Sequence, residues 1–123
     1  MINHADRFYA AVTVLAGHGH IKQRLIKAYG EHLDDIDEDE LPIAMKQAFV
    51  DLRQSMHRVK PLRGESAVCA SVRKMSPEDA SECATDVVAL YSELSRQRNE
   101  GAVAMSRDEG EAPRVPPFLI KSV

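Results

Sequence analysis

The chain has 123 residues, of which 44% are hydrophobic and 28% are charged, and its formal net charge is −3. This length is typical of one domain with a single core, and the composition is that of an ordinary globular protein. No apolar run approaches the roughly 20 residues of a membrane-spanning helix, so we expect no membrane protein. The N-terminal segment shows no signal-peptide pattern, and we therefore expect the protein in the cytoplasm.

Helical spacing of apolar residues defines the first two predicted elements. A helix is expected over about residues 4–16, where Phe8 and Leu15 share one side, and Gly17-His18-Gly19 ends it. A second helix is expected over residues 21–36, where apolar residues recur at steps of three and four. The apolar stripe of this second helix is wide, which is typical of the central helix of a bundle.

The clearest helical pattern in the chain runs from Leu41 to Val59. Phe49 lies at its centre, Pro42 is tolerated in the first turn, and Lys60-Pro61 follows the end. Residues 65–75 then fit either a short strand or a short helix. We favour the helix, because one isolated strand would leave its backbone groups unpaired.

A last helix is predicted to begin at Ser76-Pro77-Glu78-Asp79, which combines a hydroxyl cap, a proline in the first turn and acidic residues near the positive end of the helix dipole. Its apolar spacing continues to about Arg96. From Asn99 onward the composition shifts, and three prolines follow, which predicts a tail without a core of its own.

These elements predict an all-α protein. We expect a small bundle of four to five helices over residues 1–98, followed by an extended, Pro-containing C-terminal tail over residues 99–123.

Charge is divided unevenly along the chain. Residues 31–40 contain seven acidic residues and no Lys or Arg, whereas residues 53–74 contain six basic residues and a single acidic one, Glu65. This division predicts a surface with two electrostatically opposite ends, which would steer charged partners.

No cofactor or metal site is predicted. The acidic run from Asp35 begins like a calcium-binding loop, but Glu40 stands where the turn requires Gly and Lys46 stands where a bidentate Glu should be. Gly17-His18-Gly19-His20 offers two imidazoles without further ligands fixed nearby. Cys69 and Cys83 are two isolated thiols.

No catalytic residue is assigned either. Arg53 and His57 are one helical turn apart, and such a pair can hold a phosphate and move a proton. The pair superficially resembles the Arg and His pair of HEPN-type ribonucleases, which are also helical bundles, but the three residues between them here are too few for that motif. Gly64-Glu65-Ser66-Ala67-Val68 lacks the closing Gly of a nucleophile elbow.

The predicted function is therefore that of a non-enzymatic interaction or regulatory module. Its predicted partner-binding residues are the cations of the third helix and the following segment, together with an apolar cluster near the C-terminus: Lys46, Arg53, His57, Arg58, Lys60, Arg63, Arg73, Lys74, Phe118, Leu119 and Ile120. Two structural roles remain open, because cations also complement a helix C-terminus and the apolar cluster could cover the bundle itself.

A protein partner is favoured over nucleic acid, because the chain is acidic overall and has only six aromatic residues. The alternatives are a nucleic-acid-binding regulator that uses residues 53–74 and a small nuclease-like enzyme centred on Arg53 and His57. Homo-oligomer formation is left open.

Overall fold

The computed structural model describes residues 3–108, and the side chains of residues 3–97. This part of the chain is entirely helical, without a strand. Its elements are α1 (His4–Leu15), α2 (Ile21–His32), the 3-10 turn η1 (Glu38–Glu40), α3 (Ile43–Met56), α4 (Ala67–Arg73) and α5 (Pro77–Asp108). The predicted all-α bundle of four to five helices is confirmed, and α4 settles residues 65–75 as the short helix.

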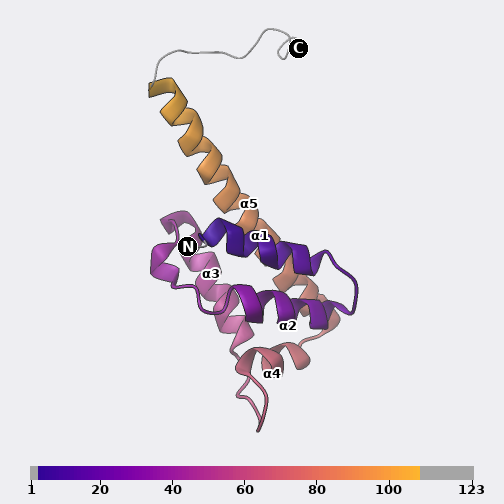
Figure 1. The fold of residues 1–123 in the computed structure, drawn as a ribbon. Coiled ribbons are helices and arrows are strands. Elements are labelled where there is room, and N and C mark those ends of the chain that lie inside the picture. The colour runs from indigo at the N-terminus through magenta and orange to yellow at the C-terminus, as the bar shows by residue number, and fades with distance from the viewer. Residues whose placement is uncertain (1–2, 109–123) are drawn as a thin grey trace.

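The helices pack around one core, with α5 as the longest element. α1 and α2 lie side by side, α5 packs against α1, α2 and α3, and α4 packs against α2 and α3 (Figure 1). Beyond these contacts α5 continues past the other helices (Figure 1). No helix in the described part of the chain has the length and apolar character to cross a membrane.

Side-chain caps explain where three helices begin. Asn3 Oδ1 accepts a hydrogen bond from the Asp6 amide at 2.9 Å at the start of α1. The hydroxyls of Ser66 and Ser76 each accept one from a backbone amide three residues later, at 3.0 Å, at the starts of α4 and α5. Each cap satisfies an amide that has no partner within the helix.

The core is built from the apolar stripes of the helices. Phe8 of α1 and Phe49 of α3 are fully buried and meet edge to face, with ring centroids 6.1 Å apart. Leu25 and Tyr29 of α2 and Val87 of α5 are also fully buried around them. Burial of each large apolar side chain contributes about 1.5–3 kcal/mol, so these stripes supply most of the stabilisation.

The second and third helices are shorter than predicted. α2 ends at His32, but the chain turns so that Ile36, outside the helix, is still only 1% exposed. α3 begins at Ile43, with Pro42 as its N-cap residue, and ends at Met56. Ala48, predicted on the apolar face of this helix, is exposed.

The last helix is longer than predicted. α5 continues to Asp108 rather than ending at about Arg96. Glu93 supports this extension, because its Oε2 accepts hydrogen bonds from Gln97 at 2.8 Å and from Arg96 at 2.5 Å, and such pairs one turn apart stabilise a helix. These hydrogen bonds, that of Gln97 first, lower the pKa of Glu93. Residues 109–123 of the predicted tail lie outside the described residues.

Buried and half-buried polar contacts join neighbouring elements. Ser71 of α4 is fully buried, and its hydroxyl accepts a hydrogen bond from the Val59 amide at 2.9 Å. Arg24 of α2 donates to the carbonyl of Leu15 at 2.5 Å, which satisfies an acceptor at the end of α1, and to the carbonyl of Gly19 in the following turn at 2.9 Å. These contacts fix the α3–α4 connection and the α1–α2 turn.

Candidate functional site

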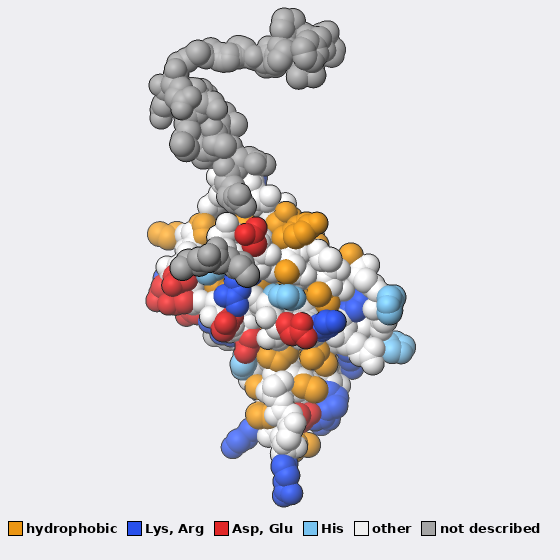
Figure 2. Space-filling view, in the orientation of Figure 1, with side chains coloured by type: hydrophobic (Ala, Val, Ile, Leu, Met, Phe, Trp, Pro, Cys, Tyr) orange, Lys and Arg blue, Asp and Glu red, His pale blue; other side chains and the backbone are white. Residues whose placement is uncertain are grey.

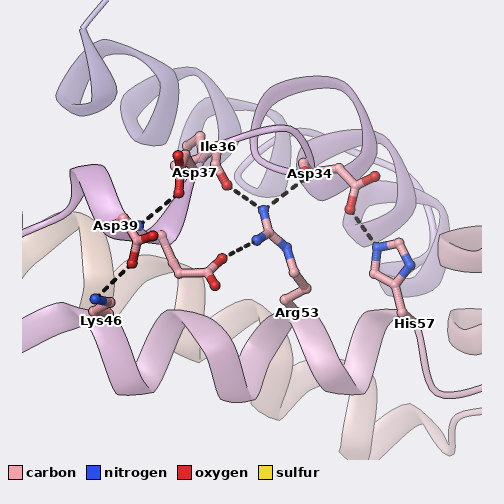
Figure 3. Close-up of polar contacts among 8 residues, drawn as sticks. Asp34, Ile36, Asp37, Asp39, Lys46, Arg53 and His57 are labelled. Carbon is pink, nitrogen blue, oxygen red and sulfur yellow. Dashed lines mark hydrogen bonds and ion pairs between the residues drawn. The ribbon is translucent and has the colours of Figure 1, made fainter.

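Arg53 is the centre of the densest polar cluster in the described part of the chain (Figure 3). Its Nη1 donates to Glu38 Oε1 at 2.5 Å, and its Nη2 donates to the carbonyls of Asp34, at 3.0 Å, and of Ile36. The guanidinium also lies 4.9 Å from the centroid of the Phe49 ring, in a cation–π contact. All these acceptors except the ring belong to residues 34–40, which we call the acidic connection.

His57 and Lys46 lie on the same edge of α3 as Arg53, and each is paired with a carboxylate of the acidic connection. His57 Nε2 lies 2.7 Å from Asp34 Oδ1, and Lys46 Nζ lies 2.8 Å from Asp39 Oδ1 (Figure 3). The hydrogen bond with Asp39 raises the pKa of Lys46, which keeps the amine charged. The spacing in the sequence therefore placed these residues correctly on one edge of α3, but the structure directs that edge at the chain's own carboxylates.

The acidic connection also binds α1. His4 Nε2 lies 2.9 Å from Glu40 Oε1, and Arg7 forms an ion pair with Asp35. The connection thus bridges α1 and α3, although in the chain it joins α2 to α3. Sequence analysis missed its role, because the pairing depends on how the segment turns after α2.

Tyr29 of α2 lies beneath this cluster. Its ring is fully buried, and its hydroxyl has no hydrogen-bond partner within the described part of the chain. Burial raises the pKa of Tyr29, and the charges of Asp34 and Arg53 act on it in opposite directions. The hydroxyl therefore stays neutral at physiological pH.

A second group of cations lies on the α3–α4 connection, and it has no acidic partner among residues 3–97. We call residues 58–64 the basic loop. Arg58, Lys60 and Arg63 are exposed there and form no ion pair with residues that the structure describes, and Leu62 between them is 66% exposed. Figure 2 shows Lys and Arg side chains gathered at this lower end of the molecule.

A glycine turn and a pair of hydrogen bonds shape the end of the basic loop. Gly64 adopts a φ of 82°, in the left-handed region that favours glycine, and turns the chain back toward α4. Glu65 then accepts a hydrogen bond from Arg73 at 2.7 Å and one from the Leu62 amide at 3.2 Å. The hydrogen bond with Arg73 lowers the pKa of Glu65, and it raises the pKa of Arg73.

The predicted partner-binding residues thus fall into separate groups. Lys46, Arg53 and His57 are engaged by the acidic connection, Arg73 is paired with Glu65, and Lys74 lies exposed at the end of α4. Arg58, Lys60 and Arg63 remain available on the basic loop. Phe118, Leu119 and Ile120 lie outside the described residues.

Two observations concern the chemical sites that the sequence suggested. Within this part of the chain, no group of three or more His, Cys, Asp or Glu residues is arranged to hold a metal ion. Arg53, which the nuclease hypothesis needs for a phosphate, already binds a carboxylate and two carbonyls.

Comparison of this chain with protein-family models, with curated proteins and with solved structures finds no match. The fold places this chain in the class of small helical bundles. The surface of the bundle is the basis for the function proposed below.

Proposed function

We propose that this protein is a non-enzymatic interaction module that binds an acidic protein surface through its basic loop. The observation that carries the proposal is the contrast between the two groups of cations. Those on the edge of α3 are neutralised by the acidic connection, whereas Arg58, Lys60 and Arg63 project from the bundle without carboxylate partners in the described residues. Exposed charges of one sign favour association with a surface of the opposite sign.

Leu62 supports a protein partner. A single exposed leucine needs no explanation, but this side chain is 66% exposed in the middle of three exposed cations. An apolar contact surrounded by charged groups is the usual organisation of a protein–protein interface. Leu62 would provide the buried contact, and the cations would provide orientation and a faster encounter.

Nucleic acid is the less favoured partner. Proteins that bind single strands combine cations with aromatic side chains on which bases stack, and residues 58–66 contain no Phe, Tyr, Trp or His. Micromolar binding to a generic duplex or single strand at physiological salt, lost when Arg58, Lys60 and Arg63 are all replaced by Ala, would instead support the regulator that binds nucleic acid.

The wider parts of the proposal follow from the sequence. The apolar residues Phe118, Leu119 and Ile120 remain a second proposed contact for a partner, and the cytoplasm remains the proposed location. A regulatory role would follow from the identity of the partner.

The test is affinity purification from the native cell with two charge reversals at different places. Arg63→Glu and Lys27→Glu change the net charge equally, and Lys27 lies exposed on α2, away from the basic loop. We expect Arg63→Glu and Leu62→Ala to lose a stoichiometric partner that wild type and Lys27→Glu recover. Equal recovery of the partner by wild type and all three variants would contradict the proposal. Equal loss of the partner in Arg63→Glu and Lys27→Glu would show that net charge, rather than the basic loop, determines binding.

A further inference from the structure

An apolar surface runs along the contact between α1 and α5, which are antiparallel. Tyr9 of α1 meets Tyr91 of α5, with ring centroids 5.9 Å apart. Further along, Val12 of α1 and Ala16, which follows α1, face Val88 of α5 across a pocket of about 320 Å³. Ile21 and Arg24 of α2 also line this pocket. We call the surface formed by Tyr9, Val12, Ala84, Val88 and Tyr91 the α1–α5 seam.

The seam is incompletely covered by the described part of the chain. Tyr9 is 59% exposed and Val88 is 45% exposed, and Val12 and Tyr91 are half-buried beside them. Two of the four large apolar side chains that the structure exposes therefore lie on one continuous strip. A contiguous patch of this kind is typical of an interaction surface, unlike scattered single residues.

The seam lies beside the part of α5 that extends beyond the other helices of the bundle. Leu94 is the last core side chain of α5 among those that the structure describes, up to residue 97, and the helix continues through residues 95–108, which is about 21 Å of further length. Figure 1 shows this part of α5 extending beyond the other helices. A helix of this length is marginal in water without packing against another element.

The charge of α5 changes along its length in a way that suits self-pairing. Residues 77–94 contain five acidic residues and no Lys or Arg, whereas residues 95–108 contain three Arg and two acidic residues. Two copies of α5 placed antiparallel would bring each acidic half beside the more basic half of the other. A parallel arrangement would bring like charges together.

We propose that the α1–α5 seam is a self-association surface, occupied by a second copy of this chain. The projecting end of each α5 lies antiparallel along the seam of the other copy, so that one two-fold axis relates them. Each projecting end is about 21 Å long and roughly 10–12 Å across. Each copy therefore contributes roughly 400–500 Å² from its seam and its projecting end together, which is the size of a weak, concentration-dependent interface rather than the about 800 Å² per partner of a stable one. This proposal uses another surface than the basic loop and is independent of it.

The test is sedimentation of the full chain over a range of concentrations. We expect a dimer that Val88→Glu weakens by about tenfold or more, because the substitution places a charge in the middle of an apolar contact. Ile43→Glu is the matched control, because Ile43 is 88% exposed on α3, away from the seam, and this variant should associate like wild type. Circular dichroism establishes that each variant is folded, and Tyr9→Glu replaces Val88→Glu if that variant unfolds.

Three outcomes would overturn the proposal. The first is a full chain that stays monomeric at every concentration. If a variant truncated after Asp108 then forms a dimer, the occupant of the seam would be residues 109–123 of the same molecule. The second is a dimer that neither seam variant affects. The third is a dimer that Ile43→Glu weakens as much as Val88→Glu does.

Discussion

Arg53 and Glu38 form an ion pair in which Nη1 and Oε1 are 2.5 Å apart, with 27% and 35% of the two side chains exposed. The same guanidinium binds the carbonyls of Asp34 and Ile36, so one side chain joins the turn after α2 to the 3-10 turn η1. The planar guanidinium group has several N–H donors and can bind three acceptors at once, which the single ammonium group of a lysine would not reproduce.

Replacement of Arg53 by Ala should lower the free energy of unfolding by about 2 kcal/mol, because it leaves a half-buried carboxylate and two carbonyls without their donor. Arg53→Lys should restore only part of the loss. Lys46→Ala is the control, because it removes one exposed ion pair and should have a smaller effect. Urea denaturation measures the free energy of unfolding of all three variants. Equal losses for Arg53→Ala and Lys46→Ala would show that the additional hydrogen bonds of the Arg53 guanidinium do not contribute.

Phe49→Ala should cost about 3–5 kcal/mol, because Phe49 is fully buried against Phe8 and its removal leaves a cavity in the core. A domain of ordinary stability would be largely unfolded by this change. Ile43→Ala, on the same helix but 88% exposed, should change stability by less than about 0.5 kcal/mol. Chemical denaturation decides this, and a loss below about 1 kcal/mol for Phe49→Ala would contradict the packing.

Ser71→Ala should cost about 1–3 kcal/mol, because it removes the acceptor of the Val59 amide in a buried setting. The volume change is small, so the loss would report the hydrogen bond rather than a cavity. Ser81→Ala, at an exposed position of α5, is the control and should be nearly neutral. Amide hydrogen exchange at Val59 gives a second measurement, since this amide should exchange faster in the variant, and unchanged exchange would argue against the bond.

Tyr29 should make the protein sensitive to alkali. Burial raises the pKa of its hydroxyl, so above about pH 10 the unfolded chain ionises Tyr29 while the folded chain keeps it protonated. The unfolded state then binds fewer protons, and the free energy of unfolding falls as the pH rises.

Tyr29→Phe should therefore flatten the decline in stability above about pH 10. It should cost little at pH 7, because the Tyr29 hydroxyl has no hydrogen-bond partner in the described structure. Tyr9→Phe, at an exposed ring, should leave the decline as it is in wild type. Urea unfolding at several pH values would measure this, and an unchanged decline in Tyr29→Phe would show that another group is responsible.

Local signals in the sequence were sufficient to place each helix, although not to fix every helix end. The spacing around Phe49 and the cap at Ser76 both depend on neighbours within one or two turns, so α3 and the start of α5 could be predicted. The end of α5 could not, because among the side chains that the structure describes, which end at residue 97, the core-facing apolar stripe reaches only Leu94. Helix continuation there depends on pairs such as Glu93 with Gln97, which are weak signals in a sequence.

The candidate site was predictable only in part. Lys46, Arg53 and His57 lie at helical steps, which correctly placed them along one edge of α3. Their engagement by Asp39, Glu38 and Asp34 depends on a long-range turn that no local pattern specifies. For the same reason, only the structure separates these engaged cations from those of the basic loop, which have no carboxylate partner in the described part of the chain.

The contact between Tyr9 and Tyr91 joins the first helix of the bundle to the last one. Because a ribosome releases the chain from its N-terminus, α1 and α2 emerge long before α5 can cover them. Phe8 and Leu25 therefore have an incomplete apolar environment until the residues around Leu94 have left the exit tunnel. During synthesis this small protein should depend on its C-terminal helix to complete folding, and a ribosome stalled in the middle of α5 would hold a chain prone to aggregate.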